Sequence, residues 1–237
     1  MARKKAPNKR ADRDSYPTPH WCIDILAEWL ERSLPMPDWV VDLGAGDGRI
    51  GSKVRGTFQV VIGAISKLML LDIVEQELTA FDAKYNVHRK QVDVLDWFDT
   101  GKAYDIIDTS DNHPERVLYV SNPPFSLGHE FVWRAVSYVK TVHAPGSACA
   151  FLLRAGWWIG GGYTNNKRAD WLNENPPDAM IGLCPRPSFV KGTSDNSEYA
   201  WYVWMHGTYQ GTQMEVALKD RNGKQRGGKQ GGQECLL

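Results

Sequence analysis

The stretch Val40–Ile50 constrains the fold of this 237-residue chain more than any other. An apolar run ends in Asp42, a glycine-rich turn follows, and Ile50 can begin a helix. Glycine lets the backbone turn tightly and approach a ligand where a Cβ would collide. The amides of such a turn, at the N-terminus of a helix, form a polar cradle at the carboxyl edge of a parallel sheet. We therefore predict a ligand-binding loop here, with an ordinary strand-to-helix turn as the alternative.

Charge and cysteine content narrow the class of protein. The formal net charge is +0, so the whole chain lacks the charge of a typical nucleic-acid binder, although basic residues gather near both ends. The four cysteines, at 22, 149, 184 and 235, show no ligand spacing, so we expect neither a disulfide framework nor a metal site. No apolar run reaches the roughly 18 residues that span a bilayer. We expect a cytoplasmic protein with no membrane partner.

Apolar patterning predicts one α/β domain over residues 15–210. Strand-like runs alternate with amphipathic helical stretches, which is typical of a doubly wound, mostly parallel sheet. The last two strands lack an intervening helix, so we expect an antiparallel finish. The runs 60–62 and 68–73 compete for the second strand. Helices are expected near 21–34, 75–84, 128–140 and 167–172, and the other strands near 39–43, 91–95, 117–120, 147–153, 180–184 and 199–205.

Both ends of the chain are expected to lie outside this domain. Residues 1–14 are polar and basic, and residues 211–237 are rich in Gly, Lys and Gln, so each predicts a flexible tail. The basic N-terminal tail is either an arm that contacts phosphate or a solvated tail.

A second stretch, Ser121–Phe125, directly follows a predicted strand about 75 residues beyond the glycine turn. Two consecutive prolines lack N–H donors and hold their carbonyls in a rigid extended turn. Asn122 adds a side-chain carbonyl, and two acceptors held together suit a planar amino group with two N–H bonds to donate. Phe125 offers a flat face on which an aromatic ring can stack. Taken alone, the motif also fits a structural turn with Phe125 in the core.

These acceptors suggest a way to activate an aromatic amine. The lone pair of such an amine is delocalised into its ring, which makes the nitrogen a poor nucleophile. Hydrogen bonds from both N–H groups to Asn122 Oδ1 and the Pro123 carbonyl favour a pyramidal nitrogen with an outward lone pair. This chemistry requires neither a covalent nucleophile nor a metal.

With these motifs the chain resembles the S-adenosylmethionine-dependent N6-adenine DNA methyltransferases. Asp42–Gly48 matches the cofactor loop, Asn122–Phe125 the catalytic motif, and Tyr16–Pro19 the motif expected upstream of the loop. The resemblance covers roughly residues 14–206. It implies a class I methyltransferase, Rossmann-like fold with a mostly parallel seven-stranded sheet and an antiparallel last strand. It also implies S-adenosyl-L-methionine as the cofactor.

The resemblance assigns the site residues by position. Asp72 is preferred to Glu75 as the acid that binds the ribose hydroxyls, and Asp93 to Asp96 as the acid near the adenine amino group. The alternative for each acid is a loop residue or a helix cap. The catalytic set is Asn122, Pro123, Pro124 and Phe125, and the cofactor-binding set is Tyr16, Thr18, Pro19, Asp42, Gly44, Ala45, Gly46, Gly48, Asp72 and Asp93.

The implied reaction is direct in-line methyl transfer to adenine N6 in double-stranded DNA, which requires the base to be flipped out. About 28 residues separate Asp93 from Asn122, too few for a recognition region. We expect recognition from insertions around 154–178 and 185–198, from the tails, or from a homodimer or helper subunit. Candidates for nucleic-acid contact are Trp157, Trp158, Tyr163 and Arg186, against ordinary packing for the aromatic residues and a surface charge for the arginine.

Other reactions use parts of the same pattern. Cytosine C5 methylation needs a cysteine nucleophile, and the chain has Asn122 in the catalytic turn and no Pro-Cys dipeptide. N4-cytosine DNA, RNA-adenine and protein-glutamine methylation all remain open, as does a non-catalytic binding module. The biological setting, a bacterial or phage-infected cell, leaves restriction–modification, phage self-protection and gene regulation as alternatives.

Overall fold

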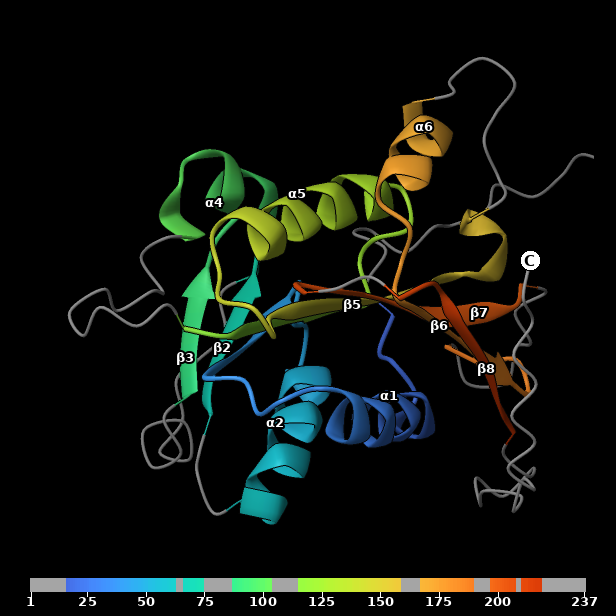
Figure 1. Cartoon of the computed structure of the whole chain (residues 1–237). Helices are drawn as coiled ribbons and strands as arrows, with labels where there is room; N and C mark the ends of the chain where they lie inside the picture. The colour runs from blue at the N-terminus through green and yellow to red at the C-terminus, as the bar shows by residue number, and fades with distance from the viewer. Residues whose placement is uncertain are drawn as a thin grey trace, which may run out of the picture.

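The computed structural model describes residues 16–62, 66–74, 87–103, 115–158, 167–189, 197–207 and 210–218. Within these ranges the chain forms one eight-stranded sheet with helices on both faces (Figure 1). The strands are β1 (Trp39–Leu43), β2 (Lys67–Asp72), β3 (Val87–Gln91), β4 (Val117–Ser121), β5 (Ala148–Arg154), β6 (Ala179–Cys184), β7 (Tyr199–Met205) and β8 (Gln213–Leu218). The helices are α1 (His20–Ser33), α2 (Arg49–Ile62), α4 (Val94–Asp99), α5 (Gly128–Thr141), α6 (Lys167–Glu174) and the 3₁₀ helix η3 (Ala155–Trp157).

The strands lie in the order β3-β2-β1-β4-β5-β7-β6-β8. Every pairing is parallel except those that β7 makes with β5 and β6. The prediction of a doubly wound, mostly parallel sheet is confirmed, and β6 and β7 form the expected antiparallel pair. The strand order reverses between β1 and β4, and in such sheets ligands bind in the crevice outside the carboxyl ends of the strands at that point.

The prediction is wrong at the C-terminal end of the sheet. A flexible tail was expected from residue 211, and seven strands with the last one antiparallel. Gln213–Leu218 instead forms an eighth strand, β8, parallel to β6. The side chains of Met214 and Val216 are 76% and 66% exposed, so β8 is not held by burial of these apolar groups. Main-chain pairing with β6, an ion pair between Glu215 and Arg32 of α1, and packing of Ala217 against the core hold it, and composition gives little sign of such contacts.

A second error concerns residues 91–95, which were expected to be a strand. The strand β3 ends at Gln91, and helix α4 begins at Val94. The Asp93 side chain accepts hydrogen bonds from the amides of Leu95 and Asp96 and so caps this helix. Between the two competing apolar runs, the second strand is 67–72, and 60–62 ends α2. The expected helix at 75–84 lies outside the described residues.

Helices cover both faces of the sheet. The helices α1 and α2 lie on one face, and α4 and α5 lie on the other (Figure 1). The apolar residues that predicted α1, including Ile25, Leu26, Trp29 and Leu30, are buried against the first face. In the part of the chain that the structure describes, no helix is long and apolar enough to cross a membrane.

The ends of β1 and β4 are tied together by a buried side chain. Ser121 is fully buried, and its hydroxyl donates a hydrogen bond of 2.5 Å to the Leu43 carbonyl. This contact fixes the two strand ends from which the glycine turn and the Asn-Pro-Pro-Phe turn depart.

Replacing Ser121 with alanine is expected to destabilise the fold. The Leu43 carbonyl loses this buried donor, which costs about 1–3 kcal/mol. Urea denaturation of Ser121→Ala measures the loss, with Ser137→Ala, an exposed position on α5, as the matched control. Equal free energies of unfolding for the two variants would contradict the assigned role of this hydrogen bond.

Candidate functional site

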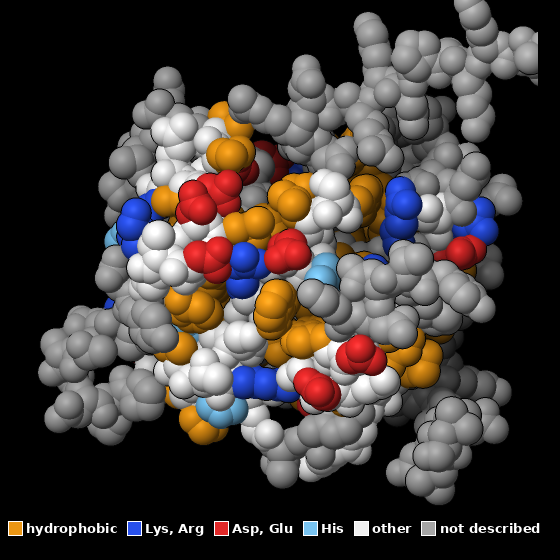
Figure 2. All heavy atoms as spheres, turned by 90° about the horizontal axis from the view of Figure 1, so that it is seen from above, with side chains coloured by type: hydrophobic (Ala, Val, Ile, Leu, Met, Phe, Trp, Pro, Cys, Tyr) orange, Lys and Arg blue, Asp and Glu red, His pale blue; other side chains and the backbone are white. Residues whose placement is uncertain are grey.

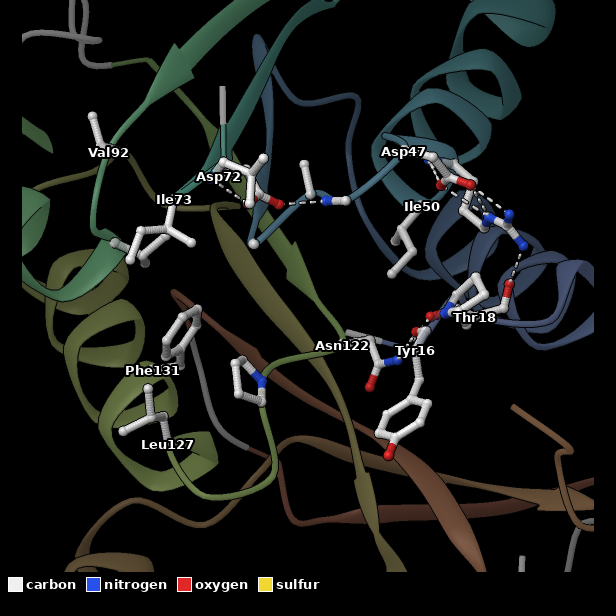
Figure 3. Close-up of a pocket in the computed structure, with 18 of the residues that line it drawn as sticks. Tyr16, Thr18, Asp47, Ile50, Asp72, Ile73, Val92, Asn122, Leu127 and Phe131 are labelled. Atoms are coloured by element: carbon white, nitrogen blue, oxygen red, sulfur yellow. Dashed lines mark hydrogen bonds and ion pairs between the residues drawn. The ribbon is translucent and has the colours of Figure 1, made fainter. Parts of the chain in front are cut away.

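A cavity of about 520 Å³ lies at the carboxyl ends of β1, β2, β3 and β4. Its volume falls in the range of small-molecule sites, roughly 300–1,000 Å³. Figure 3 shows that side chains from the turns after these strands and from the N-terminal segment point into it. The lining residues are Tyr16, Pro17, Thr18, Gly44, Ala45, Gly46, Asp47, Arg49, Ile50, Asp72, Ile73, Val74, Val92, Asp93, Val94, Asn122, Pro124, Leu127 and Phe131.

The glycine turn after β1 adopts a conformation that requires glycine. The φ angle is +53° at Gly46 and +76° at Gly48, in the left-handed region that other residues rarely adopt. A Cβ at Gly48 would also come within 2.7 Å of Leu70 Cδ1, whereas a Cβ at Gly46 would meet nothing within 4 Å. The absence of a side chain at Gly48 therefore makes room for Leu70, whereas at Gly46 it leaves open space at the cavity wall.

Asp72, at the end of β2, holds this turn in place. One of its carboxylate oxygens accepts the Gly46 amide at 2.7 Å, and the other accepts the Val74 amide at 2.9 Å. The carboxylate also lines the cavity, and its remaining lone pairs can accept hydroxyl groups of a ligand. The competitor Glu75 lies outside the described residues.

Asp42 lies beneath the turn and does not line the cavity. It is fully buried, and its Oδ2 accepts the amide of Gly51 in α2 at 2.8 Å. Burial raises the pKa of this carboxyl to about 8, with smaller contributions from Asp47 and Asp72, although the Gly51 amide lowers it. Asp42 therefore ties β1 to the start of α2 in a setting that favours its protonated form.

Asp93 and a group of apolar side chains form the other end of the cavity. Asp93 lines the cavity as well as capping α4, whereas Asp96 is not among the lining residues. Around it the lining is apolar, with Ile73 58% exposed after β2 and Phe131 on α5. A flat apolar group with polar edges fits this end.

The N-terminal segment lines the cavity beside the Asn-Pro-Pro-Phe motif. Asn122 Nδ2 donates to the Tyr16 carbonyl at 3.2 Å and to Thr18 Oγ1 at 3.0 Å. Arg49 donates to the Thr18 carbonyl at 3.1 Å and forms an ion pair with Asp47 (Figure 3). Tyr16–Thr18, the glycine turn and Asn122 thus form one connected hydrogen-bond network.

The rest of the Asn-Pro-Pro-Phe motif divides between the cavity and the core. Pro124 lines the cavity, whereas Pro123 is buried and does not. The Phe125 ring also lies outside the lining, with its plane at 22° to that of Tyr16 and their centroids 6.4 Å apart. The Arg154 guanidinium carbon lies 5.0 Å from the Phe125 centroid.

The structure brings most of the predicted site residues to this cavity. Those that do not line it are Pro19, Asp42, Gly48, Pro123 and Phe125. Sequence reasoning missed Arg49, which connects Asp47 to Thr18, and the apolar residues, of which Ile73, Val92, Leu127 and Phe131 are examples. The position of Ile73 immediately after Asp72 was a usable signal, but Arg49 carried none.

The residues expected to contact nucleic acid differ in what surrounds them. Trp157 packs edge-on against Tyr202, with centroids 5.6 Å apart, as a core-packing role predicts. Arg186 pairs with Glu198 at 2.5 Å on the surface. Tyr163 lies outside the described residues. Within those residues, no group of three or more His, Cys, Asp or Glu side chains is placed to hold a metal ion.

Comparison with solved structures identifies the fold. The M protein of the type I restriction enzyme EcoKI aligns with a TM-score of 0.53 and 12% identity, over 92% of this chain and 52% of its own. A Listeria monocytogenes protein, provisionally assigned as a class I S-adenosylmethionine-dependent methyltransferase, aligns with a TM-score of 0.57 and 13% identity, over 85% of this chain and 65% of its own.

The chain has the class I methyltransferase fold. A Vibrio vulnificus protein, provisionally assigned as a modification subunit of a type I restriction enzyme, also shares this fold, with a TM-score of 0.57 and 12% identity over 86% of this chain. The chain spans only 47% of the length of that structure. No family model matches the sequence, and no curated protein matches it.

The buried Asp42 in this methyltransferase fold predicts a pH-dependent stability. Its folded pKa, about 8, lies above the unfolded value of about 3.9, so the folded protein keeps a proton that the unfolded chain releases between these pH values. The free energy of unfolding from this group therefore falls as pH rises, with a slope approaching about 1.4 kcal/mol per pH unit.

Asp42→Asn removes this titration while keeping an acceptor for the Gly51 amide. Denaturation at pH 5 and pH 8 is expected to show the variant gaining stability relative to the wild type at the higher pH. Parallel pH dependence of the two proteins would refute the assigned protonation of Asp42.

Proposed function

We propose that this protein transfers a methyl group from S-adenosyl-L-methionine to the N6 amino group of adenine in DNA. One observation carries the proposal: the Asn122 side chain and the glycine turn line the same cavity. A donor seated on the turn then faces an acceptor suited to an amine. The fold shared with modification subunits of restriction enzymes supports the same reaction.

The lining residues fit the methyl donor. Asp72 would accept the ribose hydroxyls, and Asp93 would lie near the adenine amino group, with Ile73 and Phe131 against the ring. The glycine turn would contact the methionine part, next to Thr18. When bound, S-adenosyl-L-methionine supplies a methyl group activated by a sulfonium. The carboxylates in the cavity favour such a cation.

The catalytic motif would act on the acceptor amine by positioning and polarisation. Asn122 Oδ1 and the Pro123 carbonyl would accept the two N–H bonds, so that the nitrogen lone pair is directed at the methyl group. Phe125 would hold the ring by stacking. As the N–C bond forms and the C–S bond breaks, the nitrogen would lose one proton to solvent and the sulfonium would become a neutral thioether.

Binding of a DNA substrate requires more than the face of the domain that carries α4, α5 and α6. On the face that carries α4, α5 and α6, apolar, acidic and basic side chains are interspersed, and neither sign of charge dominates (Figure 2). Such a face gives little general attraction for phosphate. We therefore infer that the basic residues of 1–14, the segments 154–178 and 185–198, or a helper subunit or second copy supply DNA binding and target choice. The enzyme would act in the cytoplasm of a bacterial or phage-infected cell.

Asn122→Ala is expected to lower methyl transfer by at least about 100-fold, because it removes an acceptor aimed at the reacting amine. Binding of the donor, measured by calorimetry, should change little. The measurement is transfer of labelled methyl to duplex DNA, followed by digestion to nucleosides. Gln59→Ala, an amide-bearing residue on α2 away from the cavity lining, is the control.

The same assay with DNA, RNA and protein offered as separate acceptors decides among the alternatives. N6-methyldeoxyadenosine supports the proposal, whereas label only in N4-methylcytosine, in RNA or in protein would replace it with the corresponding methyltransferase. Donor binding without transfer to any of these acceptors would favour a binding module.

A further inference from the structure

The neighbours of Asn122 allow only one orientation of its side-chain amide. The Tyr16 carbonyl, 3.2 Å from the amide nitrogen, is only an acceptor. The amide nitrogen of Asn122 must therefore face this carbonyl. This settles the assignment of the oxygen and nitrogen atoms of the amide, which are otherwise easily exchanged. Its Oδ1 is then turned away from the Tyr16 carbonyl (Figure 3), and Asn122 lines the cavity.

Thr18 supplies the second partner of the same NH₂ group. Its hydroxyl oxygen lies 3.0 Å from Asn122 Nδ2, closer than the Tyr16 carbonyl. The Thr18 residue is only 3% exposed, so water has little access to take the place of this hydroxyl. The two acceptors together use both N–H bonds of the amide, which locks the Asn122 side chain rather than merely tethering it.

Residues of and next to the glycine turn hold Thr18 in position. Arg49, the first residue of α2, donates to the Thr18 carbonyl at 3.1 Å and pairs with Asp47. The Asn122 amide is thereby held by a segment anchored to the same turn that forms the proposed donor site.

We propose that Thr18 is a positioning residue for the reaction: its hydroxyl holds the Asn122 NH₂ group so that Oδ1 faces the acceptor amine. This role rests on the proposed function, and it goes beyond contact of the upstream motif with the donor. Without the hydroxyl, one N–H of Asn122 loses its acceptor and the side chain gains rotational freedom. Loss of the hydroxyl should therefore lower the rate of methyl transfer, because the amine is less well oriented, and leave the affinity for the donor unchanged.

Thr18→Val keeps the shape of the side chain and removes the acceptor. It is expected to lower kcat about 10-fold, the order of one positioning hydrogen bond to an oriented group, and to leave the Kd for S-adenosyl-L-methionine within about twofold. Thr18→Ser restores the hydroxyl and should recover most of the lost kcat. Thr141→Val, at the exposed end of α5, is the matched control, and thermal unfolding verifies that each variant is folded.

A second readout does not depend on catalysis. In the ¹⁵N-labelled wild type, the Asn122 side-chain NH₂ resonances, assigned by their loss in Asn122→Ala, should exchange with solvent about fivefold more slowly than in Thr18→Val. Thr18→Ser should restore the slow exchange. Faster exchange in Thr18→Val than in the wild type and Thr18→Ser supports the proposed contact, whether or not the protein methylates adenine. Failure of the wild type to methylate adenine would reject the proposed function and leave this contact supported.

Three results would overturn the positioning role. The first is an active wild type with unchanged kcat in Thr18→Val. The second is a loss of donor affinity in Thr18→Val as large as the loss of kcat, which would place the hydroxyl on the donor. The third is equal exchange of the Asn122 amide in both proteins.

Discussion

Parallel pairing of β1 with β4 is the constraint on which the site depends. Asp42 is paired with Val120, so Gly44 and Asn122 each follow two residues beyond the same rung of the sheet. Two segments almost eighty positions apart therefore reach one edge at the same height. Both strand ends are buried, and the Ser121 hydroxyl joins them through the Leu43 carbonyl. Any shift of one strand against the other would separate the glycine turn from the Asn-Pro-Pro-Phe turn.

Three hydrogen bonds at that edge of the sheet hold the segments that form or support the cavity wall. Asp72 accepts the amide of Gly46, Asp42 accepts the amide of Gly51, and Arg49 holds the carbonyl of Thr18. The two aspartate side chains accept backbone N–H groups at the turn and at the start of the helix, where such groups lack helical partners. The rigidity of the site thus comes from charged and polar side chains bonded to backbone, and the apolar end of the cavity supplies shape.

Local patterns predicted much of this architecture. The apolar runs 39–43 and 117–120 correctly predicted β1 and β4, because buried parallel strands are continuous apolar stretches. The pattern failed at 91–95, where Asp93 caps a helix whose short apolar run resembles a strand, and at β8, which depends on pairing with the edge of β6. The roles of Arg49 and Phe131 depend on tertiary contacts, which no spacing in the sequence records.

We propose that this cavity seats the methyl donor with its sulfur facing Asn122. A crystal structure of the full chain with S-adenosylhomocysteine tests it most directly. We expect the ribose on Asp72, the homocysteine part over the glycine turn, and the sulfur turned toward the Asn122 oxygen. A ligand bound elsewhere, or an Asn122 oxygen turned away from the sulfur, would contradict it.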